Sequence, residues 1–324
     1  MKIILVVPSF NGHFLNYIDI IKSAINESQL KVFKSSETTK IYKFCCHNKV
    51  KKIIFLHGDK DFLVSLFLKC LLPSLNISLV IYYSFEEHFK GLKYSIKKIL
   101  LKSLTFINIK LLLLEADITK IKHIRRNNIK HIYDPLILSN MSIKEKLNSK
   151  TEVHYLVAGF IDERKSIRLL FKVLIDLCNI DSKKRIITLL GVQTNSIINF
   201  ISKLDLPKNI QIIQMNYRFN NYELEEELHK CDLMWAVYQN HHGSSGMVIH
   251  AIQYNKPVIF IPKGTLKRFS LELNIDILPK DLSEEEIKRC LYKLEIEKQF
   301  SSESRINFIK KRSQQQFVKI LLND

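Results

Sequence analysis

The segment that decides the fold runs from Cys231 to Pro262 and reads CDLMWAVYQNHHGSSGMVIHAIQYNKPVIFIP. Its apolar run 233–237 has the length of a buried strand, and the polar residues 238–243 predict a loop. Beyond Gly246, apolar residues recur at helical spacing, and 258–261 is a second apolar run. The segment therefore predicts a strand, a loop, a helix and a second strand, with small residues where the helix begins.

Those small residues are Gly243, Ser244, Ser245 and Gly246. The first turn of a helix has unpaired backbone N–H groups and the positive end of the helix dipole. Small side chains let an anion come close, so a phosphate group is the natural ligand here. The same composition also suits an ordinary capped helix, in which glycine and serine only permit tight packing.

The composition indicates a soluble protein of two domains. The chain has 324 residues, of which 46% are hydrophobic and 25% charged. No stretch reaches 18 uncharged apolar residues, and the apolar start 1–8 is too short for a signal peptide, so we expect a cytoplasmic protein. The six cysteines lack paired spacing, which favours reduced thiols over a disulfide frame or a zinc site.

Basic residues are concentrated in the first half of the chain. Residues 1–150 hold 25 Lys and Arg against 11 Asp and Glu, within a total net charge of +18. The stretch 89–104 reads FKGLKYSIKKILLKSL, a basic amphipathic helix that predicts peripheral docking on an anionic membrane surface, at the inner face of the plasma membrane. A sheet-covering helix with a solvated face is the alternative. No aromatic motif accompanies the charge, so we expect no nucleic-acid partner.

Apolar runs alternate with helical patterns along the whole chain, which predicts α/β domains with mainly parallel, doubly wound sheets. We expect domains at 1–138 and 152–303, with a C-terminal helical segment 304–324 that packs back on the first domain. Within this series, 42–46 is expected as a short strand and 304–322 as one helix. Ligands of such sheets bind at the carboxyl ends of the strands.

One such strand end carries a basic pair. Residues 159–166 read GFIDERKS between a predicted strand and a predicted helix, so Arg164 and Lys165 fall at the helix start. A cation there opposes the helix dipole unless it binds an anion. We expect Lys165 to hold one side of a diphosphate and the N–H groups of 243–246 the other. The alternative is a solvent-facing basic pair beside Asp162 and Glu163.

Together these motifs resemble GT-B-fold glycosyltransferases, specifically the family-4-like retaining enzymes. The family's G-R-x-x-x-x-K-G loop is matched at 159–166. Its pair of glutamates, followed by A-x-x-x-x-x-P-V-I, is matched at His242, His250 and 251–259. The resemblance is specific over 153–262 and looser before it. It implies two Rossmann-like domains facing a central cleft, with the acceptor on the first domain and a nucleotide-sugar donor on the second.

The chain departs from the family pattern at three positions. Phe160 stands where the family has a phosphate-binding arginine, although Lys165 is kept, and His242 and His250 replace both glutamates. A neutral imidazole anchors ribose hydroxyls less strongly than a carboxylate does. These changes leave the donor nucleotide and sugar open, and they also leave open a catalytically degenerate binding subunit.

The resemblance implies sugar transfer with retention, in which the leaving phosphate oxygen deprotonates the acceptor. Backbone N–H groups and Lys165 then stabilise the growing charge on the leaving diphosphate, and no cofactor is implied. Three histidines are candidates for contact with the sugar or acceptor, although each alone fits an ordinary loop residue: His13, His88 and His242. The expected donor-binding residues are Gly159, Arg164, Lys165, Gly191, Asn216, Tyr217, Gly243, Ser244, Ser245, Gly246 and His250.

The sequence thus predicts a glycosyltransferase that acts on a bacterial surface polysaccharide or glycolipid, such as lipopolysaccharide or capsule, with a glycan or lipid-linked acceptor. A nucleotide-sugar epimerase of the same fold is the rival enzyme, and it would need acid and base carboxylates. The triplet Asp59-Lys60-Asp61 resembles a metal-binding D-x-D motif, but Asp61 is better placed to cap a helix that begins at Phe62. We therefore expect no metal site.

Overall fold

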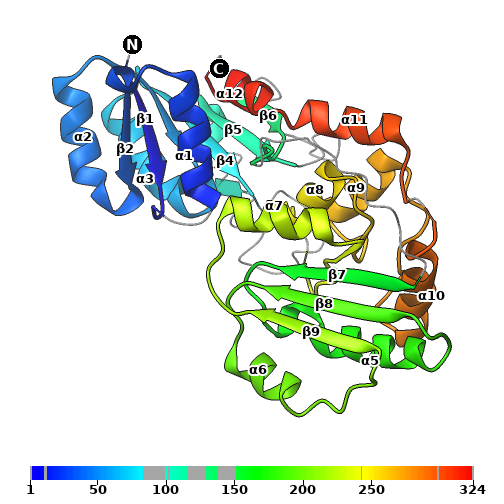
Figure 1. The fold of residues 1–324 in the computed structure, drawn as a ribbon. Coiled ribbons are helices and arrows are strands. Elements are labelled where there is room, and N and C mark those ends of the chain that lie inside the picture. The colour runs from blue at the N-terminus through cyan, green and yellow to red at the C-terminus, as the bar shows by residue number, and fades with distance from the viewer. Residues whose placement is uncertain are drawn as a thin grey trace. The chain divides into compact units, whose positions relative to one another are not determined.

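The computed structural model describes residues 2–10, 13–82, 99–100, 103–115, 128–137, 151–241, 243–297 and 299–322, with the side chain of residue 13 excepted. The chain divides into two compact units (Figure 1). Unit 1 comprises Met1–Ile137 and Lys311–Asp324, and unit 2 comprises Leu138–Lys310. Each unit contains one parallel sheet covered by helices, which confirms the predicted pair of Rossmann-like α/β folds.

Unit 1 is built on a six-stranded parallel sheet in the order β2-β1-β3-β4-β5-β6. Its strands are β1 (Lys2–Val7), β2 (Leu30–Lys34), β3 (Val50–Phe55), β4 (Asn76–Ile81), β5 (Ile109–Leu114) and β6 (Ile129–Ile132). Its helices include α1 (His13–Ala24), α2 (Thr38–His47), α3 (Gly58–Leu71) and α12 (Gln314–Leu322), with 3-10 turns η1 (Glu27–Gln29) and η2 (Ser35–Glu37).

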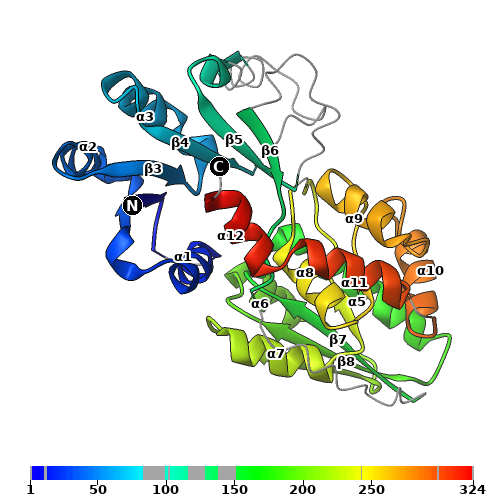
Figure 2. The same cartoon turned by 90° about the horizontal axis from the view of Figure 1, so that it is seen from above.

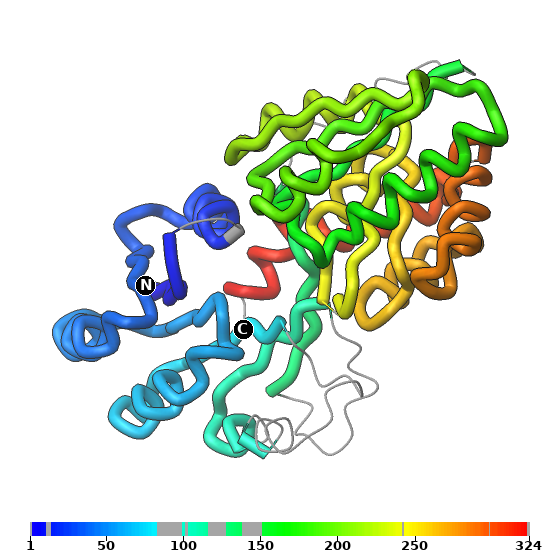
Figure 3. Tube along the Cα trace, turned by 90° about the horizontal axis from the view of Figure 1, so that it is seen from below, coloured from blue at the N-terminus to red at the C-terminus, as the bar shows by residue number. Residues whose placement is uncertain are grey.

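Both faces of this sheet are buried along most of β1, β3, β4 and β5, each of which contains an apolar run. In β1, Ile4 and Val6 pack in the core beneath α2 and α3, whereas Ile3, Leu5 and Val7 pack in the core beneath α1 and α12. The alternation follows from the twofold side-chain period of a strand. Figures 2 and 3 show α1 on one side of the sheet and α2 and α3 on the other.

The expectation of a strand at 42–46 was wrong, because this segment belongs to helix α2. Ile41 is fully buried, and Phe44 and Cys45, three and four residues later, pack against the same core. That spacing is helical, and a short apolar run does not by itself separate a strand from a helix.

The single helix expected over 304–322 is instead two helices, α11 (Ser302–Lys311) and α12. The break brings the fully buried Arg312 against Glu115, which follows β5 and is itself buried. Arg312 donates to both carboxylate oxygens, at 2.8 and 2.9 Å, and its carbonyl oxygen accepts from the N–H of Leu136 at 2.9 Å. A buried charge of this kind requires its partner, so Arg312 fixes α12 to unit 1.

Unit 2 is built on a five-stranded parallel sheet in the order β11-β10-β7-β8-β9. Its strands are β7 (Glu152–Ala158), β8 (Lys184–Leu190), β9 (Ile210–Met215), β10 (Leu233–Trp235) and β11 (Val258–Ile259). Its helices include α5 (Ile167–Cys178), α6 (Asn195–Ile201), α7 (Asn221–Lys230), α8 (Gly246–Gln253), α9 (Thr265–Leu273) and α10 (Glu284–Leu294), and 3-10 turn η5 (Glu163–Lys165) precedes α5.

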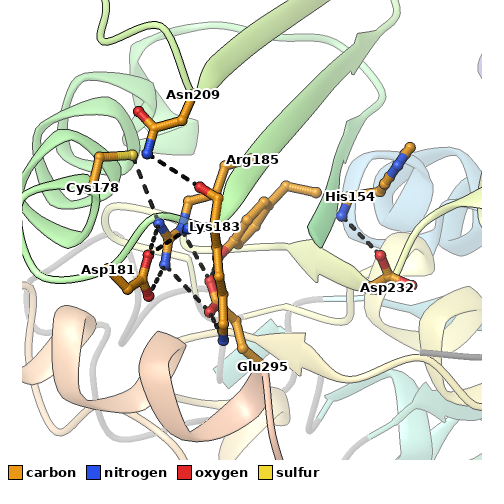
Figure 4. Close-up of polar contacts among 9 residues, drawn as sticks. His154, Cys178, Asp181, Lys183, Arg185, Asn209, Asp232 and Glu295 are labelled. Carbon is orange, nitrogen blue, oxygen red and sulfur yellow. Dashed lines mark hydrogen bonds and ion pairs between the residues drawn. The ribbon is translucent and has the colours of Figure 1, made fainter. Parts of the chain in front are cut away.

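A buried ionic cluster lies at the amino-terminal edge of the unit 2 sheet (Figure 4). Arg185, fully buried in β8, donates to both carboxylate oxygens of Asp181 at 2.8 and 2.9 Å and to Glu295 at 3.1 Å. Lys183 also pairs with Glu295, at 2.9 Å. The cluster connects the chain after α10 to β8 and lies at the opposite edge from the strand ends where ligands of such sheets bind.

Candidate functional site

The order of the strands in unit 2 marks one place on the sheet for a ligand. The adjacent strands β7 and β10 lead in opposite directions across the sheet, β7 to β8 and β10 to β11. Open α/β sheets bind ligands at such a reversal, at the carboxyl ends of the two strands. The loops at this position are 159–166, after β7, and 236–245, after β10. They contain most of the donor-binding residues expected from the sequence.

Two glycines allow the neighbouring loops to approach each other closely. Gly159 has φ +99° and Gly191 has φ +127°, backbone conformations that L side chains rarely adopt. A Cβ atom on Gly191 would lie 2.1 Å from the carbonyl oxygen of Gly159. The end of β8 therefore packs directly on the end of β7, and Gly191 has a structural reason to be glycine.

Lys165 lies over the end of β7 and is only 7% exposed. Its ammonium donates to the carbonyl oxygen of Ala158 and lies 5.1 Å from the centroid of the Tyr238 ring. Its own carbonyl oxygen accepts from the indole N–H of the buried Trp235 at 2.7 Å. These contacts fix the ammonium beside the loop after β10, and its burial excludes the alternative of a solvent-facing lysine.

Arg164 differs from its neighbour. Its guanidinium is largely exposed and pairs with Asp162 at 2.8 Å. Its carbonyl oxygen accepts from the N–H of Gln239 at 2.8 Å, which joins the two loops through the backbone. The side chain of Arg164 thus has a partner within its own turn, and its role toward a donor stays a prediction.

The amino terminus of α8 is connected to Lys165 through Tyr238. Ser245 caps the helix, since its hydroxyl accepts from the N–H of Val248 at 3.4 Å, and it also contacts the Tyr238 hydroxyl at 3.1 Å. Among the described atoms, a Cβ atom on Gly246 would meet none within 4 Å, and one on Gly243 would meet only His241, at 3.9 Å. The first turn therefore has room for a group to approach its N–H groups, as an anion would.

Tyr238 and His241 belong to this site, although the sequence pattern marked them only as part of a polar loop. Their rings lie 4.8 Å apart, and the Nε2 atom of His241 lies 3.1 Å from the carbonyl oxygen of Ser244. Tyr238 thus links the buried lysine to the helix cap. Only the fold brings Tyr238 next to Lys165, so no local signal could have found it.

The next strand ends carry the other expected donor residues. The side-chain oxygen of Asn216, after β9, accepts from the N–H of Gln193 at 2.8 Å, while Tyr217 is 41% exposed. The side chain of Gln193 is buried, and neither of its amide atoms has a hydrogen-bond partner among the described residues. Phe160 is 54% exposed, so the position of the family's arginine presents an apolar ring to solvent.

His250 stands in the second turn of α8 and is buried. Burial lowers its pKa to about 4, so the imidazole is neutral at physiological pH. Within the described part of the chain, its Nδ1 atom has no hydrogen-bond partner. An imidazole in this state can accept or donate one hydrogen bond to a hydroxyl group, but it supplies no charge.

Three predicted contacts cannot be located. His88 and His242 lie outside the described residues, and α1 begins at His13, whose side chain is also outside them. Their roles stay predictions.

The D-x-D triplet has a structural use in unit 1. Helix α3 begins at Gly58 rather than Phe62, so the expectation that Asp61 caps it was wrong. Asp61 is buried and accepts from the hydroxyl of Ser35 at 2.8 Å, and Asp59 accepts from the N–H of Tyr82 at 2.6 Å. Within the described ranges, no three His, Cys, Asp or Glu side chains are grouped so as to hold a metal ion. Nor does any described helix have the length and apolarity needed to cross a membrane.

No protein-family model matches the sequence, and no curated protein matches it. Solved structures do. The chain is similar to Anabaena HepE in complex with UDP, at 14% identity and TM-score 0.69, over 100% of this chain and 99% of that one. It is similar to the lipopolysaccharide outer core galactosyltransferase WaaB, at 11% identity and TM-score 0.69, over 100% and 98%. It is also similar to UDP-GlcNAc 2-epimerase from Methanocaldococcus jannaschii, at 13% identity and TM-score 0.64, over all of both chains.

At these identities the likeness establishes the fold alone. The chain shares the two-unit architecture of GT-B nucleotide-sugar glycosyltransferases, and an epimerase of nucleotide sugars shares it as well. Function therefore has to be argued from the side chains of the chain itself.

Proposed function

We propose that this protein is a glycosyltransferase of the family-4-like type, which transfers a sugar with retention from a nucleotide-sugar donor on unit 2. The acceptor is a bacterial surface polysaccharide or a glycolipid. Unit 1 is the acceptor-side domain in this account. One observation carries the proposal: the buried ammonium of Lys165 and the open first turn of α8 lie on the two loops that meet at the reversal of the unit 2 sheet.

This arrangement suits a diphosphate leaving group. Negative charge grows on the leaving phosphate as the bond to the sugar breaks, and donors fixed in advance stabilise that charge most in the transition state. Lys165 supplies one fixed cation, and the N–H groups at Gly246 supply the dipole end of a helix. No protein base is required if a leaving phosphate oxygen takes the acceptor's proton. The UDP held by HepE and the substrate class of WaaB support a nucleotide donor and a glycan acceptor.

The difference between an active enzyme and a degenerate binding subunit depends on whether His250 can take over the ribose contact of the family's glutamate. In the active enzyme its neutral imidazole replaces a carboxylate toward the donor ribose, through the unpaired Nδ1 atom. Weaker ribose anchoring lowers donor affinity but leaves the groups at the diphosphate in place. The epimerase alternative rests on its structural likeness, and product analysis distinguishes it, since an epimerase releases no nucleoside diphosphate when it converts the donor.

A thermal-shift screen tests the proposal. UDP, GDP, CDP, ADP and their common sugar conjugates are each added to the protein, because a ligand that binds only the folded state raises the melting temperature. We expect one nucleotide and its sugar conjugates to respond. The absence of any response from folded protein would contradict a nucleotide-sugar transferase.

The proposed enzyme docks on the inner face of the plasma membrane. Of the basic stretch 89–104, the structure describes only residues 99–100 and 103–104, in which Ile99 is exposed and Leu104 is buried. Support comes from α3, where Leu63, Phe67 and Leu71 follow one another at intervals of four and are 61%, 53% and 46% exposed. In liposome flotation with anionic lipid at low salt we expect the protein to float and a Phe67→Asp variant to float less. Recovery of both only in the soluble fraction would contradict membrane docking.

A further inference from the structure

The sheet of unit 1 has its own reversal point, and a histidine that the sequence motifs did not single out lies there. Strand β1 lies between β2 and β3, and the chain leaves β1 and β3 in opposite directions across the sheet. A ligand site is therefore expected beside the loops after these two strands. His57 follows β3 by two residues and precedes the first residue of α3, Gly58.

Aromatic rings from two other elements hold His57. The ring of Phe14, in α1, lies 5.9 Å from the imidazole centroid, and the ring of Tyr82, directly after β4, lies 5.3 Å from it. Phe14 and Tyr82 also contact each other, edge to face, at 6.3 Å. Two segments distant in sequence thus hold the imidazole at the carboxyl edge of the sheet.

One atom in this cluster has an unmet hydrogen-bonding need. The Nδ1 atom of His57 is buried and has no hydrogen-bond partner among the residues that the structure describes. An unsatisfied buried nitrogen is costly, and native structures normally pair such atoms with protein, water or ligand. The atom therefore indicates a group that binds here and hydrogen-bonds to it.

The surrounding groups indicate what kind of ligand this is. The Tyr17 hydroxyl donates to Asp134, after β6, at 2.5 Å. Burial and the nearby Asp134 raise the pKa of Tyr17 and of Tyr82, so both stay protonated and neutral. The carboxyl groups of Asp134 and Asp59, which accept from the Tyr17 hydroxyl and from the N–H of Tyr82, make the cluster unsuited to an anion. Aromatic rings, neutral hydroxyls and a carboxylate suit a neutral polyhydroxy compound, whose hydroxyl groups both donate and accept.

We infer that His57, held by Phe14 and Tyr82 beside the Tyr17–Asp134 pair, binds a hydroxyl group of a neutral sugar through its Nδ1 atom and is an acceptor-binding residue of unit 1. This inference rests on the proposed function, because that function requires a sugar acceptor. It differs from the donor site in position, since all five residues belong to unit 1 and the donor groups belong to unit 2.

Histidine-selective 15N labelling tests the inference without turnover. The chain has 11 histidines, and comparison with a His57→Gln variant assigns the His57 ring signals. The folded wild-type protein is titrated with methyl glycosides of glucose, galactose, mannose and N-acetylglucosamine, each up to a concentration on the order of 0.1 M. At least one should shift the His57 ring nitrogens while leaving the exposed His47 of the same unit unchanged. The inference is overturned if all four leave the His57 signals in place.

The same samples separate this inference from the proposed function. Nucleoside diphosphates should leave the His57 signals unchanged while raising the melting temperature through unit 2. A nucleotide response without any sugar response would overturn the role of His57 alone. A sugar response without a nucleotide response would keep His57 as a sugar-binding residue and overturn the transferase.

In a transfer assay with the donor that responds in the screen, His57→Ala should raise the KM for the sugar acceptor by roughly tenfold, the loss of one hydrogen bond to a buried group. The affinity for the nucleoside diphosphate should change less than twofold. His57→Gln keeps a donor and an acceptor on the side chain and should recover part of the loss, whereas the matched surface variant His47→Gln should behave as wild type. An unchanged acceptor KM in His57→Ala would contradict the assignment.

Discussion

The ammonium of Lys165 lies 5.1 Å from the centroid of the Tyr238 ring, although 72 residues, among them strands β8, β9 and β10, lie between the two in the sequence. Lys165 belongs to the loop after β7, and Tyr238 to the loop after β10. Tyr238 in turn contacts Ser245, the cap of α8. Tyr238 therefore contacts both Lys165 and the cap of α8. We propose that Lys165 and the first turn of α8 hold the donor diphosphate.

The close approach of the β7 and β8 ends depends on Gly191. A Gly191→Ala variant would place Cβ 2.1 Å from a backbone oxygen at φ +127°, so it should lose at least about 1–3 kcal/mol of unfolding free energy. Gly246→Ala is the matched control, because its Cβ meets no described atom within 4 Å, and it should stay within about 0.5 kcal/mol of wild type. Urea unfolding followed by fluorescence of Trp235, the single tryptophan, measures both. Equal stability of the two variants would contradict the packing described.

The neutral state of His250 makes the stability of unit 2 depend on pH. Its pKa is about 4 in the folded protein and near 6.5 when unfolded, so between these values the unfolded chain binds more protons. The contribution of neutral His250 to the free energy of unfolding is fully present above pH 6.5. It is lost as the pH falls towards 4, by an amount on the order of 3 kcal/mol.

A His250→Gln variant removes this titration. The free energy of unfolding should therefore fall less between pH 7 and pH 4.5 in the variant than in wild type, as measured by urea unfolding at each pH. His229→Gln, in which a side chain that reaches solvent is changed, should follow wild type. Parallel curves for His250→Gln and wild type would show that His250 is protonated normally in the fold.

The ionic cluster of Figure 4 is structural. Removing Glu295 leaves the buried guanidinium of Arg185 without one of its two carboxylate partners. Glu295→Ala should therefore lose about 3–5 kcal/mol of unfolding free energy. The control is Glu284→Ala, which breaks a solvent-exposed pair with Lys172 and should lose no more than about 1 kcal/mol. Losses of similar size in the two variants would mean that burial adds nothing to the Glu295 contact.

The sequence predicted features that depend on short stretches. The strand, loop and helix around Gly246 follow from periodicity and from small residues, and so does the basic pair after β7. What it missed depends on tertiary contacts. The break between α11 and α12 occurs where the side chain of Arg312 pairs with Glu115, 197 positions away. Residues 38–47 form a helix and not a strand, because the buried face of that helix packs against the unit 1 core.

The same distinction between local pattern and tertiary contact applies to the residues of the candidate sites. Lys165 and the turn at Gly246 were predicted from local pattern, but Tyr238 and His57 have no motif, since their neighbours come from other strand ends. Arg164 shows the opposite case. Arg164 is adjacent to Lys165 and has the same charge, but its side chain is exposed and paired with Asp162, whereas that of Lys165 is buried. The two side chains differ in burial because they leave the turn at 163–165 at successive positions.

The central claim, that Lys165 binds the donor diphosphate, is tested most directly by calorimetric titration of wild type, Lys165→Ala and the exposed-lysine control Lys203→Ala with the nucleoside diphosphate that responds in the screen. The loss of one charge-assisted contact predicts about 1.5–3 kcal/mol weaker binding for Lys165→Ala, and binding like wild type for Lys203→Ala. An unchanged affinity in folded Lys165→Ala would contradict the claim.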